Sequence, residues 1–254
     1  MKKVTCITLS IIFSYTQASF NELNWMRYFW ATYQQSSNNY EHAQQWYKEL
    51  FDHSPSVYAY KGYVHFLDRI HDYPQIVRLS KHMSPTSTDS EIEMILARAL
   101  ASTGDTKGSF KKITDLAAKE PTNQEAAFSA AQVYIQQNNL EKAIETIDKF
   151  LNKVARRPTH FIFYFLKGSV LAQQSNKAAA LKEIKESLSI HPQFDKAWLL
   201  YAIIHEQVGN IPEAVQGYSS YLKYTQEPAP DIEQHLQQLL FQLKTLQTSS
   251  KKTN

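Results

Sequence analysis

The stretch that decides the fold is FIFYFLKGSVLAQQSNKAAALKEIKESLSIHPQF, residues 161–194. Residues in two sets recur at spacings of three and four, so each set shares one face of a helix: Tyr164, Gly168 and Leu171 in the first, and Ala180, Ile184, Ser187 and Leu188 in the second. Ser175 and Asn176 favour a turn followed by a helix N-cap. Pro192 cannot continue the second helix, because it lacks a backbone N–H and its ring would clash with the preceding turn. The stretch therefore predicts a hairpin of two short helices.

Small residues are expected where the two helices of this hairpin cross. Gly168 and Ala180 have almost no side chain, so they allow the helix axes to come close. A single hairpin cannot bury its apolar faces alone and needs a copy on each side. Matching positions of the second helix recur 33, 33, 34, 37 and 34 residues apart, with Ile76 the poorest match: Ala43, Ile76, Ser109, Ala143, Ala180 and Ala214. Prolines punctuate the copies at positions 55, 85, 121, 158, 192 and 228.

The unit at residues 195–226 shows the repeated pattern clearly. Its characteristic residues are Ala197, Trp198, Tyr201, Ala202, His205, Gly209, Ala214, Tyr218 and Leu222. The pattern resembles the tetratricopeptide repeat, W-x2-L-G-x2-Y followed by A-x3-F and a proline over about 34 residues. The resemblance covers residues 24–228 and is degenerate in residues 55–85. It implies an all-α fold, an α-solenoid of about six antiparallel helix hairpins wound into a right-handed superhelix.

The same phasing sets the expected domain boundaries. The repeat solenoid is expected over residues 21–228, with units at 24–55, 55–88, 90–121, 124–158, 161–192 and 195–226. Residues 229–246 carry an apolar stripe, with Asp231 as a helix N-cap, and are typical of the terminal capping helix that such stacks need. Residues 247–254 are expected to form a disordered tail.

Residues 1–18 have the layout of a secretory signal peptide. Lys2 and Lys3 precede a mostly apolar run, and Ala18 is a small residue at the expected cleavage position. Cleavage predicts an exported bacterial protein, periplasmic or secreted, with no membrane span once the leader is removed. The alternatives are an uncleaved anchor, an irregular N-terminus and a cytoplasmic protein. Cys6 is the only cysteine, so a mature chain would have no thiol for a disulfide or for catalysis.

The sequence contains no motif that indicates an enzyme, a metal site or a nucleotide site. HExxH, G-x-S-x-G, a Gly-rich phosphate loop and metal-spaced cysteines are all absent. His65 and His71 lie six positions apart with no third ligand in phase, so a structural role is favoured over metal binding. The formal net charge of +3 is too small to indicate a nucleic-acid partner. We therefore expect no catalysis, no cofactor and no bound metal.

The first helix of the first unit is very aromatic, with Trp25, Tyr28, Phe29, Trp30 and Tyr33. The first repeat of a stack usually presents a polar outer face. Either the chain that follows the leader covers these side chains, or they bind a partner. Burial is the favoured interpretation.

Function in the tetratricopeptide repeat family lies in the concave groove lined by the first helix of each unit. The resemblance therefore implies a protein-interaction scaffold with a protein or peptide partner. In the register given above, the groove residues are Tyr28, Tyr63, Met94, Phe128, Ile162, Phe165, Leu199 and Ile203. Their apolar character favours a helix or an extended segment with apolar anchors. Alternatively, they pack between neighbouring helices, or the C-terminal helix folds back and fills the groove.

The resemblance and the leader together suggest a scaffold for envelope or secreted complex assembly, either as a monomer or within a hetero-complex. A secreted effector and a cytosolic adaptor are the alternatives. The positions that match the carboxylate clamp of chaperone-binding family members hold Tyr28, Thr32, Tyr60, Glu91 and Ile95. Binding of chaperone tails is therefore not expected.

Overall fold

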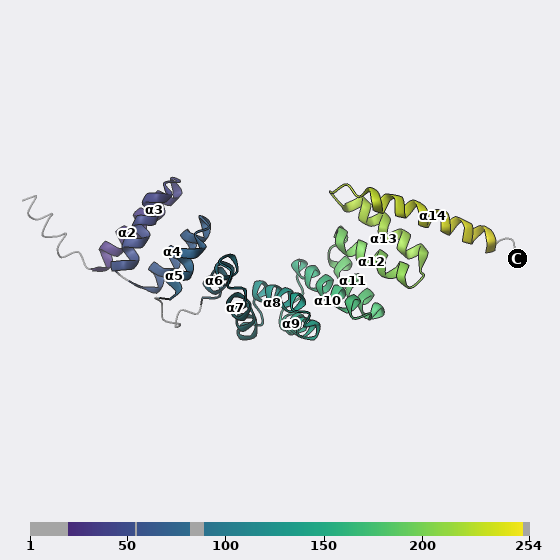
Figure 1. The fold of residues 1–254 in the computed structure, drawn as a ribbon, viewed down its shortest axis with the longest axis horizontal. Helices are drawn as coiled ribbons and strands as arrows, with labels where there is room; N and C mark the ends of the chain where they lie inside the picture. The colour runs from purple at the N-terminus through teal and green to yellow at the C-terminus, as the bar shows by residue number, and fades with distance from the viewer. Residues whose placement is uncertain (1–19, 54, 82–88, 251–254) are drawn as a thin grey trace, which may run out of the picture. The chain divides into compact units, whose positions relative to one another are not determined.

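The computed structural model describes residues 20–53, 55–81 and 89–250 (Figure 1). Within these ranges the chain forms thirteen α-helices and one short 3₁₀ turn, with no strand. The all-α fold expected from the sequence is therefore confirmed. Residues 1–18, and with them the expected leader and Cys6, lie outside the described part of the chain.

Twelve of the helices pair into six hairpins, and a single helix follows them. The pairs are α2 (Phe20–Ser36) with α3 (Tyr40–His53), α4 (Val57–Arg69) with α5 (Tyr73–Ser80), α6 (Ser90–Ser102) with α7 (Thr106–Lys119), α8 (Gln124–Gln136) with α9 (Leu140–Lys153), α10 (Phe161–Gln173) with α11 (Lys177–Ile190), and α12 (Asp195–Gln207) with α13 (Ile211–Tyr224). The 3₁₀ turn η1 (Pro158–His160) precedes α10, and α14 (Pro230–Ser250) ends the series.

The chain divides into two compact units, Met1–Leu116 and Ala117–Asn254. In the described part of the first unit, α2 packs on α3, α3 packs on α4, and both α4 and α5 pack on α6. In the second unit, each helix from α8 to α14 packs on the next in the chain, and α10 also contacts α12. Hairpins therefore stack on hairpins within each unit, as a solenoid requires. Helix α7 begins in the first unit and ends in the second.

Each of the six hairpin turns contains one residue with a positive φ. These residues are Asn38, His71, Gly104, Asn138, Ser175 and Gly209. They lie 33, 33, 34, 37 and 34 positions apart, which is the spacing of the matching second-helix positions found in the sequence. Glycine and asparagine tolerate this left-handed conformation better than most residues. His71 therefore occupies a structural position in a turn.

The crossing of α10 and α11 has the close approach that the sequence predicts. Gly168 is buried, and a Cβ at this position would lie 2.7 Å from Cδ1 of Ile184 and 3.2 Å from the backbone oxygen of Ala180. The next hairpin has an equivalent contact that the sequence analysis did not single out. A Cβ on Gly217 would lie 2.7 Å from Cβ of Ala202.

Helix α14 covers the apolar end of the last hairpin, as a capping helix should. Leu239 is buried, and it forms one cluster with Ala202, Ala214 and Tyr218, against which Ile232 and Leu236 pack. The expected N-cap is corrected. The helix begins at Pro230, because proline suits the first helical positions, and Asp231 therefore lies in the first turn.

The last described residues of the chain continue α14 past the expected boundary at Leu246. The helix extends through Ser250, so residues 247–250 of the expected tail are helical, and residues 251–254 lie outside the described part. No glycine or proline follows Pro230, so no helix breaker stops the helix at the end of its apolar stripe.

The burial expected for the aromatic side chains of α2 is wrong for the described part of the chain. Trp30 and Tyr33 are 40% and 51% exposed, and they contact each other edge to face with ring centroids 5.6 Å apart. Tyr28 is 42% exposed but lies edge to face against Tyr47 of α3. Pairing between aromatic rings thus replaces part of the expected burial.

Candidate functional site

The structure separates the eight expected groove residues into core and surface positions. Tyr63 and Met94 belong to the core, with 1% and 8% of their surface exposed. The ring of Tyr63 stacks on that of Tyr47, with centroids 6.1 Å apart and planes 9° apart. Tyr63 therefore joins two hairpins of the first unit, and both Tyr63 and Met94 are covered by other side chains.

Phe128 and Ile162 pack against a core cluster of the second unit. The cluster contains Phe150 and Phe163, whose rings stack at a centroid distance of 4.4 Å. Phe128 meets Phe163 edge to face at 5.9 Å and stays half-buried. The alternative anticipated from the sequence, packing between neighbouring helices, therefore describes these two residues.

The remaining three residues of the second unit come together in one pocket. Phe165 of α10 and Leu199 and Ile203 of α12 line a hollow of about 770 Å³. The other lining residues come from α10, the loop before α12, α12 itself, the end of α13 and the segment after it: Ser169, Gln193, Asp195, Lys196, Leu200, Tyr221, Tyr224, Thr225, Gln226 and Glu227. We call this hollow the unit 2 pocket. Its apolar floor and tyrosine edge suit an apolar side chain of a partner.

Local packing fixes the floor of the unit 2 pocket. The ring of Phe165 contacts that of Phe194 edge to face, with centroids 4.9 Å apart. Trp198 donates a hydrogen bond of 2.8 Å from Nε1 to the backbone oxygen of Pro192, which ties the first turn of α12 to the preceding loop. Leu199 and Ile203 are half-buried against the cluster under α14. The pocket is therefore built on rigid helices, and α14 caps the stack while the pocket stays open.

A second pocket, of about 670 Å³, lies between α2 and α4 in the first unit. We call it the unit 1 pocket. It is lined by Asn24, Tyr28, Thr32, Gln35, Ser36, Tyr47, Leu50, Ser56, Tyr58, Ala59, Lys61, Gly62, His65 and Arg69. Tyr28 is the one expected groove residue among them.

A glycine makes room for the floor of the unit 1 pocket. A Cβ on Gly62 would lie 2.8 Å from Cε2 of Tyr28 and 3.2 Å from Cε1 of Tyr47. Tyr28 can therefore lie directly on the backbone of α4. In the sequence, Gly62 lies in a first helix one repeat after the aromatic Tyr28. Periodicity alone does not show that these two residues are in contact.

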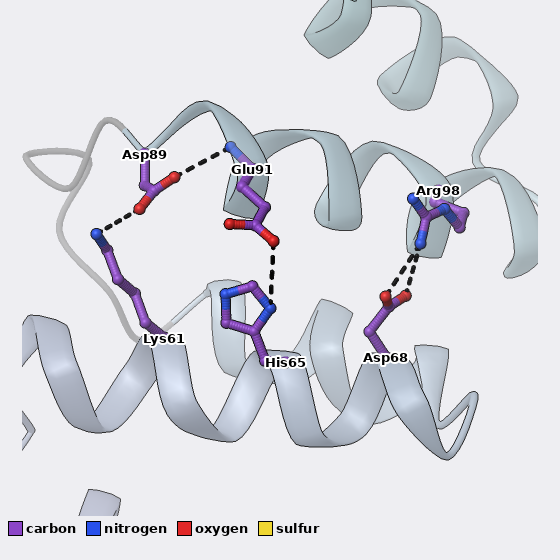
Figure 2. A network of polar contacts seen from close by, with 6 residues as sticks. All are labelled: Lys61, His65, Asp68, Asp89, Glu91 and Arg98. Atoms are coloured by element: carbon purple, nitrogen blue, oxygen red, sulfur yellow. Dashed lines mark hydrogen bonds and ion pairs between the residues drawn. The ribbon is translucent and has the colours of Figure 1, made fainter. Parts of the chain in front are cut away.

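Charged side chains connect α4 to α6 (Figure 2), and two of those on α4, Lys61 and His65, also line the unit 1 pocket. Lys61 pairs with Asp89, the N-cap of α6, and Nδ1 of His65 lies 3.8 Å from Oε1 of Glu91. Both carboxylate oxygens of Asp68 accept hydrogen bonds of 3.0 Å from Arg98. The hydrogen bonds to Lys61 hold the pKa of Asp89 below its usual value, and burial opposes this only in part.

A partly buried polar network joins α12, α13 and α14. Tyr218 donates a hydrogen bond of 2.7 Å to Glu206, and Nε2 of His235 lies 3.0 Å from both carboxylate oxygens of Glu206. Burial favours a raised pKa for Glu206, but these two hydrogen bonds outweigh burial and lower the pKa. Glu206 is therefore a partly buried carboxylate that is held by groups on two other helices, Tyr218 of α13 and His235 of α14.

His205 lies next to this network and is buried with its Nε2 unpartnered among the described residues. Nδ1 is 3.3 Å from the side-chain amide of Asn210. Burial lowers the pKa of His205, which favours the neutral form of the imidazole. Among the described residues, no group of three or more His, Cys, Asp or Glu side chains could hold a metal ion. No helix in the described ranges has the length and hydropathy needed to span a bilayer.

Part of the chain matches a known protein family. Residues 96–158, from α6 to the end of the loop after α9, match the family model described as tetratricopeptide repeat. The chain contains tetratricopeptide repeats. The recognition made from the spacing of small residues and from the W-x2-L-G-x2-Y-like unit is thereby confirmed.

Solved structures of tetratricopeptide repeat proteins share the fold. MamA is 19% identical, with a TM-score of 0.54 over 68% of this chain and 94% of MamA. YrrB, described as a TPR protein with an unusual peptide-binding site, is 18% identical, with a TM-score of 0.54 over 66% of this chain and 86% of YrrB. The C-terminal part of a TPR repeat-containing protein from Cytophaga hutchinsonii is 15% identical, with a TM-score of 0.61 over 78% of each chain. At these identities the likeness shows the fold.

Curated relatives are larger proteins. The protein O-mannosyl-transferase TMTC1 of Homo sapiens is 25% identical over 161 residues, which are 62% of this chain and 18% of the human protein. The same protein of Mus musculus is 26% identical over 134 residues, 52% of this chain and 14% of the mouse protein. The chain therefore spans less than a fifth of the length of the curated relatives that it matches.

Proposed function

We propose that this chain is a non-enzymatic scaffold that binds a peptide or helix of a partner protein through the unit 2 pocket. The observation that carries the proposal is that Phe165, Leu199 and Ile203 line one open pocket on the first helices of two stacked hairpins. The repeat register also predicts all three on the binding face. Stacked tetratricopeptide hairpins support an interaction role, and YrrB, a TPR protein of similar fold, has an unusual peptide-binding site.

The chemistry of the pocket supports an apolar anchor as the recognised feature. The apolar lining residues are Phe165, Leu199, Leu200 and Ile203, and Tyr221 and Tyr224 also line the pocket. Tyrosine side chains offer apolar area together with a hydroxyl group for a hydrogen bond. Asp195, Lys196 and Glu227 are the charged lining residues, which is too mixed a set to select a strongly charged ligand.

The cellular setting belongs to the same proposal. The leader-like residues 1–18 support an exported scaffold in envelope or secreted complex assembly, in the periplasm or outside the cell. A secreted effector and a cytosolic adaptor remain the alternative roles. No cofactor enters any of these functions, and the partner is a protein or peptide in each of them.

Peptide selection followed by mutation tests the proposal. Random twelve-residue peptides would be selected on the full chain, and their affinities measured for the parent, for Tyr224→Ala and for Lys182→Ala. Tyr224 stands at the pocket edge, whereas Lys182 is an exposed residue of α11 outside the lining. Truncating an aromatic hot spot costs about 2 kcal/mol or more, which is about thirtyfold in affinity. We expect that loss for Tyr224→Ala alone. Equal affinities for all three proteins, for every selected peptide, would reject the pocket as the site.

A further inference from the structure

We infer that the unit 1 pocket takes an extended, acidic segment of a partner protein, with an apolar anchor over Tyr28 and Gly62 and a side-chain carboxylate at Arg69. The inference rests on the proposed scaffold function and adds a second binding site with its own ligand chemistry. It is carried by the lining of the pocket and by the charges along α4.

The centre of the unit 1 pocket is apolar and shaped by close packing. Tyr28 lies across Gly62, and Tyr47, Leu50 and Ala59 complete the floor. Tyr28 keeps 42% of its surface exposed, while Tyr47 and Leu50 beneath it are buried. An aromatic or aliphatic side chain of a partner placed here would cover the exposed part of Tyr28 without breaking any contact among the described residues.

The charged side chains that line the pocket are all basic or titratable to a cation. Lys61, His65 and Arg69 lie at positions i, i+4 and i+8 of α4, so they form one stripe along the pocket. Among the described residues that line the pocket, none is an aspartate or a glutamate. Charge complementarity therefore favours an acidic occupant.

Carboxylates of the chain itself already lie next to two of the three residues of this stripe. Asp89 pairs with Lys61, and Glu91 lies 3.8 Å from His65, a distance too long for a hydrogen bond (Figure 2). Arg69 has no carboxylate within 4.0 Å in the described ranges of the chain. The last position of the stripe is therefore the one that a partner's carboxylate can occupy.

The surroundings of Arg69 suit a carboxylate. Gln35 and Ser36 line the same end of the pocket, and the hydroxyl of Tyr47 donates a 3.0 Å hydrogen bond to Oε1 of Gln35. Burial raises the pKa of Tyr47 to about 12, the charge of Tyr28 adds to this, and the charge of Arg69 opposes it. The Arg69 guanidinium has a planar fork of N–H donors, which matches the geometry of a carboxylate.

The distance between the two features sets the spacing in the ligand. Gly62 and Arg69 are seven positions apart on α4, which corresponds to about 10 Å along a helix axis. An extended peptide advances about 3.3 Å per residue, so about three residues separate the anchor from the carboxylate. A carboxylate in a side chain, inside the segment, meets this requirement.

Three synthetic peptides test the inference. Each is a fluorescein-labelled, C-terminally amidated twelve-residue peptide of Gly and Ser with one Phe, followed three residues later by Glu, Gln or Lys. Binding to the full chain would be measured by fluorescence anisotropy at low salt. An exposed ion pair is worth up to about 1 kcal/mol, or about fivefold in affinity. We expect the Glu peptide to bind about three- to fivefold more tightly than the Gln peptide, and the Lys peptide to bind most weakly.

A pair of arginine variants locates the effect. Arg69→Gln should bring the Glu peptide to the affinity of the Gln peptide and leave the Gln peptide unchanged. Arg78→Gln is the matched control, because Arg78 is exposed on α5 and does not line the pocket. Melting temperatures of both variants would show that the effect is one of binding, since Arg69 also lies in the last turn of α4, where a cation stabilises the helix.

Three outcomes would overturn the inference. Equal affinities of the Glu and Gln peptides, or an unchanged Glu preference in Arg69→Gln, would remove the carboxylate site. If Tyr28→Ala weakened both peptides equally in those cases, peptide binding itself would stand. Absence of binding by all three peptides would remove the unit 1 pocket as a site for this ligand, while the selection experiment on the unit 2 pocket would still judge the proposed function separately.

Discussion

Replacement of Gly168 tests the helix crossing that sets the repeat register in the second unit. A Cβ at this position would lie 2.7 Å from Cδ1 and 2.9 Å from Cγ1 of Ile184, and 3.2 Å from the backbone oxygen of Ala180. Optimal separations between carbon atoms are about 3.5–4.0 Å. Ile184 is fully buried, so its side chain has little space into which it could withdraw.

Gly168→Leu would place a Cβ and three further carbon atoms in this crossing. Overpacking of a core costs about 1–3 kcal/mol, and the better helix propensity of leucine returns about 1 kcal/mol at most. The backbone oxygen of Ala180 cannot move without moving α11, which places the cost at the upper end of that range. We therefore expect a net destabilisation of about 1–2 kcal/mol, equivalent to a melting temperature lower by about 2–8 °C.

Thermal unfolding followed by circular dichroism would measure the effect. Lys182→Ala is the matched control, because Lys182 is an exposed residue of α11, and its truncation should cost under about 0.5 kcal/mol. Gly168→Ala adds the Cβ alone and gains helix propensity, so it should fall between the two. Equal melting temperatures for Gly168→Leu and Lys182→Ala would refute the proposed crossing.

The second unit should lose stability as the pH falls below about 6.5, because burial lowers the pKa of His205 and the unfolded chain therefore binds a proton at a higher pH than the folded chain. Urea unfolding midpoints at pH 7.5 and 5.5 measure this loss. An equal loss between these two pH values in the His205→Gln variant and in the parent would contradict the role of His205. Tyr63→Ala should destabilise the chain by about 3–5 kcal/mol as a core truncation, and an unchanged urea midpoint would contradict its burial. In the native host, mass spectrometry should find the mature N-terminus near Ala18, and an intact Met1 on a cytosolic protein would reject export.

Much of the fold could be predicted because each repeat has the same physical requirements, so the same residue types recur along the chain. Close helix crossings need small residues, and the turns need residues that tolerate a positive φ, so both recur with the same spacing. The spacing predicts the close approach at Gly168. It does not predict the one at Gly217, because helical spacing alone does not show that Gly217 meets Ala202 on the neighbouring helix.

The candidate site was less predictable, because helical spacing does not say which neighbour a side chain meets. Tyr63 has the spacing of a groove residue, but it stacks on Tyr47 and is buried. The unit 1 pocket depends on the contact of Tyr28 with Gly62, which lies one repeat away in sequence. The partners of charged side chains are equally hard to predict from spacing. Glu206 has the sequence context of an exposed acid, but Tyr218 of α13 and His235 of α14 form hydrogen bonds with it.

The central claim is that a partner peptide occupies the unit 2 pocket. Methyl-labelled NMR of the full chain, titrated with a peptide selected on it, measures this directly. We expect chemical-shift changes at the methyl groups of Leu199 and Ile203 in the pocket, with the core methyl groups of Ile147 and Ile184 unchanged. Changes confined to Leu240, which is exposed on α14, with Leu199 and Ile203 unaffected, would contradict it.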